Sequence, residues 1–151
     1  MNYHPQKQKH FMSLPKKVIS WPVEKRYEEA ILATQEAMKR IPEPWQKYAE
    51  AISCLAVIGD YYRLMGKHPQ AIHFLEESLR LWNLSGMTDP NYPRNPYTLL
   101  SLGEIFYEMG ERKKAFEYLH EAWLLEGDEI FEIRVEPYNR IDHKKYFDFL
   151  K

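Results

Sequence analysis

The feature of the sequence that most limits its fold is a pattern that occurs twice, in residues 61–81 and again in residues 106–125. When the two stretches are aligned on Gly66 and Gly110, large residues fall on large residues and small residues on small ones. Small side chains let two antiparallel helices approach closely, while large side chains fill the space between them. The chain is therefore predicted to contain two helical hairpins. The matched small residues are Gly59, Ala71 and Ser78 in the first copy, and Gly103, Ala115 and Ala122 in the second.

Apolar residues recur with a helical period along the rest of the central sequence. Residues 23–41 carry one apolar stripe, which ends at Pro42 and Pro44 because proline disfavours a helical conformation at the residue before it. No stretch alternates apolar and polar residues for long enough to make a sheet. The sequence predicts an all-α fold. The four further predicted helices run from residue 44 or 45 to Gly66, over residues 69–82, over residues 96–109, and from Gly110 to Gly127.

The chain divides into two predicted parts. Residues 1–20 show no sustained period, contain Pro5 and Pro15, and carry four lysines, so they are predicted to form a basic N-terminal arm. Residues 21–151 are predicted to form one helical repeat domain, since a chain of 151 residues has the size of a single domain.

Composition and charge argue against several classes of protein. The longest apolar runs fall short of the roughly 18 residues that a membrane-spanning helix needs, and no signal peptide is visible. Cys54 is the single cysteine, so a disulfide framework is excluded and a reducing cytoplasm is the expected compartment. The formal net charge of −1 argues against a dedicated nucleic-acid binder. We expect a cytoplasmic protein with neither nucleic acid nor membrane as its partner.

The sequence predicts no enzymatic activity. Its 6 histidines are scattered, without the paired spacing that a zinc site on a helix requires. Neither a glycine-rich phosphate loop nor a Gly-x-Ser-x-Gly motif occurs. We therefore expect no catalytic residues, no metal and no cofactor.

Both hairpins resemble the tetratricopeptide repeat (TPR), a unit of about 34 residues with Leu-Gly, an aromatic residue, a turn glycine and two alanine positions at fixed spacing. The helix over residues 23–41 is similar to the second half of a degenerate third copy. The resemblance implies a short right-handed solenoid with two clear repeats, one degenerate repeat and a C-terminal segment that caps it. The residues that carry the degenerate copy are Tyr27, Ala30, Thr34, Ala37 and Pro42.

A narrower resemblance rests on the order of four motifs. They are IGDYYRLMG at residues 58–66, NPYTLLSLGEIFYEMG at 95–110, GDEIF at 127–131 and KKYFDFL at 144–150. Together they resemble the short TPR-like immunity proteins of bacterial polymorphic toxin systems. The sequence departs from that group in NYPR at residues 91–94 and in RVEPYNRIDHK at 134–144. Both departures lie in predicted loops, where contacts specific to one partner tend to occur.

The resemblance also indicates where a partner would bind. In such repeats the first helix of each hairpin lines the concave face, and its outward positions meet the partner. Tyrosine, arginine and carboxylate side chains there suit a protein partner with basic and apolar features. The alternative is that these are ordinary solvated helix positions. The predicted protein-binding residues are Asp60, Arg63, Tyr97, Leu100, Glu104, Tyr107 and Glu108.

Two functions follow as hypotheses. In the first, the chain is an immunity protein that binds and neutralises a cognate bacterial toxin domain. In the second, it is a general TPR peptide-binding adaptor or co-chaperone whose concave face holds a short peptide tail. A third reading, nucleic-acid binding through the basic arm, is disfavoured by the nearly neutral net charge of −1.

Overall fold

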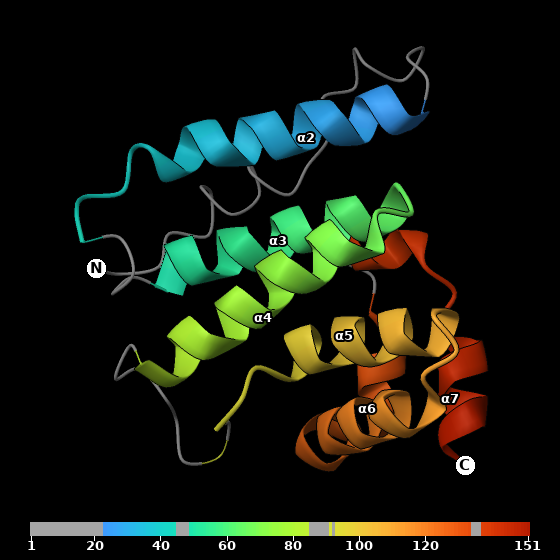
Figure 1. Ribbon diagram of the computed structural model, residues 1–151. Helices are drawn as coiled ribbons and strands as arrows, with labels where there is room; N and C mark the ends of the chain where they lie inside the picture. The colour runs from blue at the N-terminus through green and yellow to red at the C-terminus, as the bar shows by residue number, and fades with distance from the viewer. Residues whose placement is uncertain (1–22, 45–48, 85–90, 92, 134–136) are drawn as a thin grey trace.

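The computed structural model describes residues 23–44, 49–84, 91, 93–133 and 137–151, and every regular element in them is helical (Figure 1). The predicted all-α fold is confirmed over this part of the chain. The predicted basic arm at residues 1–20 lies outside the described residues. The elements in chain order are α2 (Val23–Met38), α3 (Ala49–Leu64), α4 (His68–Leu84), α5 (Pro96–Glu108), α6 (Arg112–Glu126), η3 (Gly127–Glu132), η4 (Tyr138–Arg140) and α7 (Lys144–Leu150).

Helices α3 and α4 form one hairpin, and α5 and α6 form the other (Figure 1). The predicted close approach occurs at the glycines. A Cβ atom on Gly59 would lie 2.8 Å from Cγ of Leu75, and one on Gly103 would lie 2.7 Å from Cγ of Leu119. The equivalent leucines therefore occupy the space that the two glycines leave open.

The turns of the two hairpins are built in the same way. Gly66 and Gly110 have positive φ angles of 74° and 83°, which glycine adopts without a steric penalty. In the first turn the amide of Gly66 donates to Arg63 O at 2.9 Å, and that of Lys67 donates to Tyr62 O at 3.0 Å. The second turn repeats both bonds. This pair of bonds is the Schellman motif, which satisfies the last carbonyls of a helix.

Helix α2, the predicted second half of a degenerate repeat, packs against α3. Tyr27, Ala30 and Ile31 lie in one apolar cluster with Val57, Ile58 and Tyr61 of α3. Thr34 is fully buried and satisfies its hydroxyl by donating to Ala30 O at 2.8 Å. Helix α2 ends at Met38 rather than at Ile41, and residues 39–41 continue as a turn before Pro42.

The C-terminal segment, described over residues 127–133 and 137–150, returns to the two hairpins. Ile130 and Phe131 of η3 and Tyr146 of α7 belong to the same apolar cluster as the core of α5 and α6. Figure 1 shows α7 beside the ends of α5 and α6, and η4 near the end of α3. This segment covers hairpin surface, as the expected cap would.

Candidate protein-binding surface

The facing sides of α3 and α5 carry a buried ion pair. Nη1 of Arg63 donates to Oε1 of Glu104 at 2.5 Å, and their side chains are 7% and 0% exposed. The two residues lie on the first helices of successive hairpins, on the face that the sequence assigned to partner binding. A pair of charges this deep is stable only when further hydrogen bonds complete the coordination of both groups.

Residues of the C-terminal segment complete that coordination. Nδ1 of His143 lies 2.5 Å from Oε2 of Glu104, and its Nε2–H faces the carbonyl oxygen of Tyr138 at 3.0 Å. Nη2 of Arg63 donates to the hydroxyl of Tyr146 at 3.1 Å, and that hydroxyl donates to Glu108 at 2.6 Å. The C-terminal segment is thus fixed to α3 and α5 by a continuous polar network.

The network favours the protonated form of His143. Burial works to lower the pKa of His143, but the hydrogen bond and negative charge of Glu104 outweigh it, so the net pKa is raised. When His143 is protonated, each oxygen of the Glu104 carboxylate meets a cation, Arg63 on one side and His143 on the other. Attraction to two neighbouring cations offsets part of the cost of burying the Glu104 carboxylate.

A second buried carboxylate, Asp60, lies beside this network. It is fully buried, and burial raises its pKa to about 6, although Ser101, Arg63 and Tyr138 nearby counteract the shift. Within the described residues, neither carboxylate oxygen has a partner at full hydrogen-bonding geometry. An ionised carboxylate in this place is costly because burial disfavours the charged form.

The seven predicted binding residues divide into two groups. Asp60, Arg63, Leu100 and Glu104 are buried, with Leu100 and Glu104 at 0% exposure, so their side chains do not face solvent in this conformation. His143 and Tyr146 of the C-terminal segment lie against Glu104 and Arg63. Whether any of them contributes to binding stays a prediction.

The other three residues lie at the border of the covered face. Tyr97 is 41% exposed with its ring 6.1 Å from that of Tyr138, and Glu108 is exposed. Tyr107 is partly buried against Phe149, with the guanidinium of Arg112 3.7 Å above its ring. These three side chains remain available, wholly or in part, at the edge of the C-terminal segment.

Sequence reasoning did not find Tyr138, His143 and Tyr146 as members of this site. No local spacing connects His143 with its partner Glu104, which lies 39 residues earlier, so the sequence pattern shows only a scattered histidine. Tyr146 belongs to the KKYFDFL motif, but a motif this short does not specify which surface of the fold it covers.

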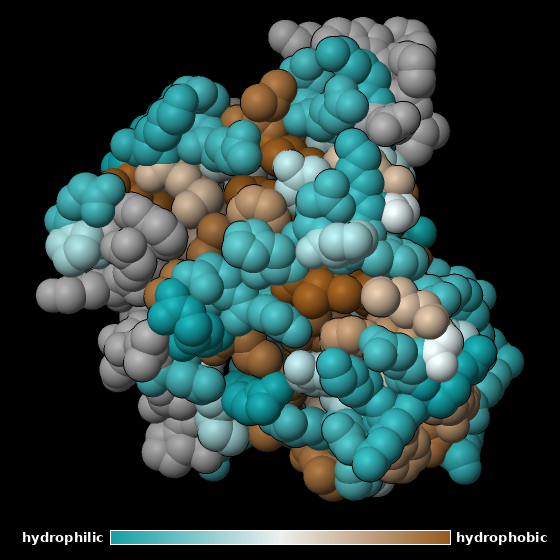
Figure 2. All heavy atoms as spheres, viewed as in Figure 1, coloured by the Kyte–Doolittle hydropathy of each residue, from teal (hydrophilic) through white to brown (hydrophobic). Residues whose placement is uncertain are grey.

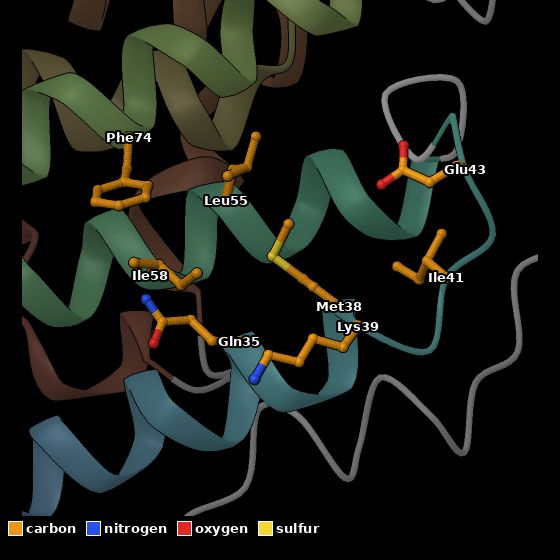
Figure 3. A pocket seen from close by; sticks show the side chains of 8 residues that line it. All are labelled: Gln35, Met38, Lys39, Ile41, Glu43, Leu55, Ile58 and Phe74. Atoms are coloured by element: carbon orange, nitrogen blue, oxygen red, sulfur yellow. The ribbon is translucent and has the colours of Figure 1, made fainter.

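A second concave feature lies on another side of the fold, between α2 and α4. It is a groove of about 420 Å³. Figure 3 shows Leu55 and Ile58 of α3 between Phe74 of α4 and the α2 side chains, and Figure 2 shows apolar residues visible in the furrows between helices. Its lining is apolar with a polar rim, as in sites that take up a side chain. The lining residues are Gln35, Met38, Lys39, Ile41, Glu43, Leu55, Ile58 and Phe74.

The described residues show neither a candidate metal site nor a candidate membrane-spanning helix. They contain no group of three or more His, Cys, Asp or Glu side chains arranged to hold a metal ion. In the same residues no helix has both the length and the apolar character needed to cross a membrane.

Comparison with known protein families identifies one of the hairpins. Residues 51–83 match the family model described as tetratricopeptide repeat. The match runs from near the start of α3 to near the end of α4, and so covers the first hairpin. No curated protein matches the chain. The match supports a TPR protein, and a TPR module implies binding to another protein.

Proposed function

We propose that this chain is a non-enzymatic protein-binding module, and specifically an immunity protein that binds and neutralises a cognate bacterial toxin domain. The observation that carries the proposal is the order of the four motifs between residues 58 and 150, which combines a TPR hairpin with a particular C-terminal segment. A TPR hairpin alone supports protein binding of any kind. The C-terminal motifs support the narrower role.

The positions of these motifs in the fold separate scaffold from recognition. Gly59 sits at the close approach of α3 and α4, and the side chain of Asn95 accepts a hydrogen bond from Tyr97 N at 3.0 Å to cap α5. Ile130 and Tyr146 are each 2% exposed. The shared motifs therefore build the fold. Recognition of one particular toxin falls to exposed positions between them.

The border of the covered face is the proposed contact surface. Tyr97 offers a large, partly exposed aromatic ring, a residue type that often dominates protein interfaces. Glu108 offers a carboxylate that Lys145 and Tyr146 already orient, at 2.5 and 2.6 Å. A toxin surface with basic and apolar features would meet both. Arg63 and Glu104 would then act by positioning η4 and α7.

The adaptor alternative has less support. A peptide tail on the facing sides of α3 and α5 would have to displace Tyr138, His143 and Tyr146, which occupy that face. An adaptor of this kind would bind peptides without any dependence on a neighbouring toxin, and reversing the charge of Arg63 or Glu104 would abolish that binding.

The decisive experiment pairs this chain with the product of the gene beside its own. We expect that product to stop growth when expressed alone, and co-expression of this chain to restore growth and to yield a tight one-to-one complex. Tyr97→Asp should weaken both rescue and complex, whereas Leu32→Asp, at a 55% exposed position on α2, should leave both intact. A neighbouring product that is harmless alone, or toxicity that this chain does not change, would refute the immunity role.

A further inference from the structure

The outer face of α6 carries a row of stacked rings. The rings of Phe116 and His120 lie 5.4 Å apart at an interplanar angle of 10°, and those of His120 and Trp123 lie 6.0 Å apart at 26°. Phe116 is 43% exposed, Trp123 36% and Leu124 63%. We call these four residues the α6 ladder. Figure 1 places α6 at the far end of the helix stack from α2.

The ladder points away from α5, and of its rings Phe116 also lies near α7, 6.4 Å from the ring of Phe149. Ala115, Leu119 and Ala122 are 0% exposed and turn toward α5, where Gly103 lies against Leu119. The interior therefore needs only one side of α6. A second apolar side on a surface helix indicates contact with another molecule.

The charged residues of α6 are placed opposite to the arrangement that the helix dipole favours. Three basic residues occupy the first turn, where the helix carries partial positive charge, and acidic residues gather at its last residue and just beyond, where it carries partial negative charge. Each such placement costs about 0.3–1 kcal/mol at the surface. Glu111 at the N-cap is the one favourable exception. The basic residues are Arg112, Lys113 and Lys114, and the acidic ones Glu126, Asp128 and Glu129.

Most of these charges are not neutralised inside the molecule. Arg112 and Lys114 lie over the rings of Tyr107 and Phe106, at 3.7 and 4.9 Å. Asp128 accepts a hydrogen bond from Nε1 of Trp123 at 2.7 Å. Across the residues that the structure describes, no ion pair joins Lys113 or Glu129 to an opposite charge. The folded chain itself gives no reason for this charge order.

We propose that two copies of this chain associate through the α6 ladder, with their α6 helices antiparallel. In that arrangement the basic start of each α6 lies beside the acidic end of the other, and the ladders stack against each other. The basic group at residues 112–114 and the acidic group at 126–129 are arranged about His120, so the twofold axis passes near that residue. One contact thereby buries the apolar face and pairs the reversed charges. The same patch serves on both copies, as a twofold interface requires.

The first test is cross-linking at the axis. In His120→Cys each new thiol lies opposite its copy in the second molecule, so mild oxidation should produce a disulfide-linked dimer quickly. A disulfide requires Cα atoms within about 7 Å of each other. Leu32→Cys, at an exposed position on α2, should cross-link far more slowly. The native Cys54 does not interfere, because it is 3% exposed and burial raises its pKa to about 12.

The second test measures the molecular mass of the full chain by sedimentation from about 1 μM to about 200 μM, a range that covers micromolar association. The wild-type mass should rise toward that of a dimer, and Phe116→Glu should stay monomeric. Lys113→Glu should weaken the dimer, and adding Glu129→Lys should restore it, since the pairing is then reversed. Leu32→Glu is the control, at a position on α2 that is 55% exposed against 43% for Phe116.

Both tests can refute the proposed dimer without any knowledge of the toxin. A chain that remains monomeric throughout the range, or His120→Cys that cross-links no faster than Leu32→Cys, overturns it. Because neither test involves a toxin, failure here is distinct from failure of the immunity role. If Phe116→Glu loses helical circular dichroism, the Lys113 and Glu129 charge pair, both at exposed positions, decides the matter.

Discussion

A single buried carboxylate sets one part of the stability of this fold. Asp60 is fully buried with its pKa raised from 3.8 to about 6, so between those values the folded state holds a proton that the unfolded state has released. The folded state therefore loses stability as the pH rises through this range. A shift of this size corresponds to about 2 to 3 kcal/mol at neutral pH.

Asp60→Asn should consequently raise the free energy of unfolding at pH 8 by up to about 2 kcal/mol. The amide carries no charge, and the hydroxyls of Ser101 and Tyr138 lie close enough to form hydrogen bonds with it. Urea unfolding at pH 4 and pH 8 measures the effect, with Glu132→Gln as an exposed control. A variant less stable than wild type at pH 8 would show that attraction to Arg63 exceeds the cost of burial.

The protonated form of His143 should make the stability of the fold depend on pH. Its pKa is raised because Glu104 outweighs the opposing effect of burial, so its contribution is complete below the unfolded value of about 6.5. That contribution is lost as the pH rises through the folded pKa. His143→Gln should cost about 3 kcal/mol at pH 6, as expected when a buried pair loses one partner, and less at pH 9.

The measurement for His143 is the difference in unfolding free energy between wild type and variant, followed from pH 6 to pH 9. His73→Gln serves as the control, since His73 lies exposed on α4. A difference that stays constant over this range would mean that His143 acts through shape or neutral hydrogen bonding and not through its charge.

At the scale of single residues, the sequence predicts faces better than it predicts exposure. Arg63 and Glu104 were placed on one face because they occupy first helices of successive hairpins, and they do meet there at 2.5 Å. Helical spacing defines that face but contains no information about a distant segment that covers it. The covering residues lie 39 and 83 positions away from their partners, so no local pattern reports the contacts.

At the scale of helices, small residues determine how closely each hairpin packs. Gly59→Ala and Gly103→Ala should each destabilise the fold by about 1–3 kcal/mol, because the new methyl group overlaps a buried leucine. Alanine is the better helix former by about 1 kcal/mol, so the packing loss has to exceed that gain. At Gly59 a backbone oxygen, Ala71 O at 3.1 Å, also limits any adjustment.

Thermal unfolding of both glycine variants tests this, with Glu117→Ala at an exposed position of α6 as the control for helix propensity. We expect Glu117→Ala to leave the unfolding free energy nearly unchanged. If Gly59→Ala and Gly103→Ala were more stable than wild type, the matched registers of the two hairpins would not be the source of their close packing.

The helices themselves were largely predictable, because apolar stripes, turn glycines and prolines act locally. The turn at Gly66 and the cap at Asn95 follow from residue type alone, and both occur. The short elements η3 and η4 were not predicted as helices, since 6-residue and 3-residue segments contain too little of any period. Their place on the fold depends on tertiary contacts.

At the scale of the molecule, the C-terminal segment is part of the core and not an appendage. One apolar cluster runs from Leu75 of α4 through Leu102 of α5 to Phe131 and Tyr146. The polar network of Arg63, Glu104 and His143 lies beneath the same segment. The two hairpins alone would leave this apolar and charged surface facing water, and helical repeats of this kind need roughly three copies for a stable stack. Residues 127–150 therefore take the place of a further repeat.

Removal of residues 127–151 should accordingly abolish cooperative folding. The cut removes Ile130, Phe131, Tyr138 and Tyr146, all at most 8% exposed, and truncating even one large buried side chain costs about 3–5 kcal/mol. The sum approaches the whole stability of a domain, about 5–15 kcal/mol. Near-ultraviolet circular dichroism and urea unfolding measure the result, with removal of the exposed Lys151 alone as the control. A truncated chain that unfolds at the wild-type urea midpoint would instead establish that the hairpins are self-sufficient and that the segment is a detachable cover over α3 and α5.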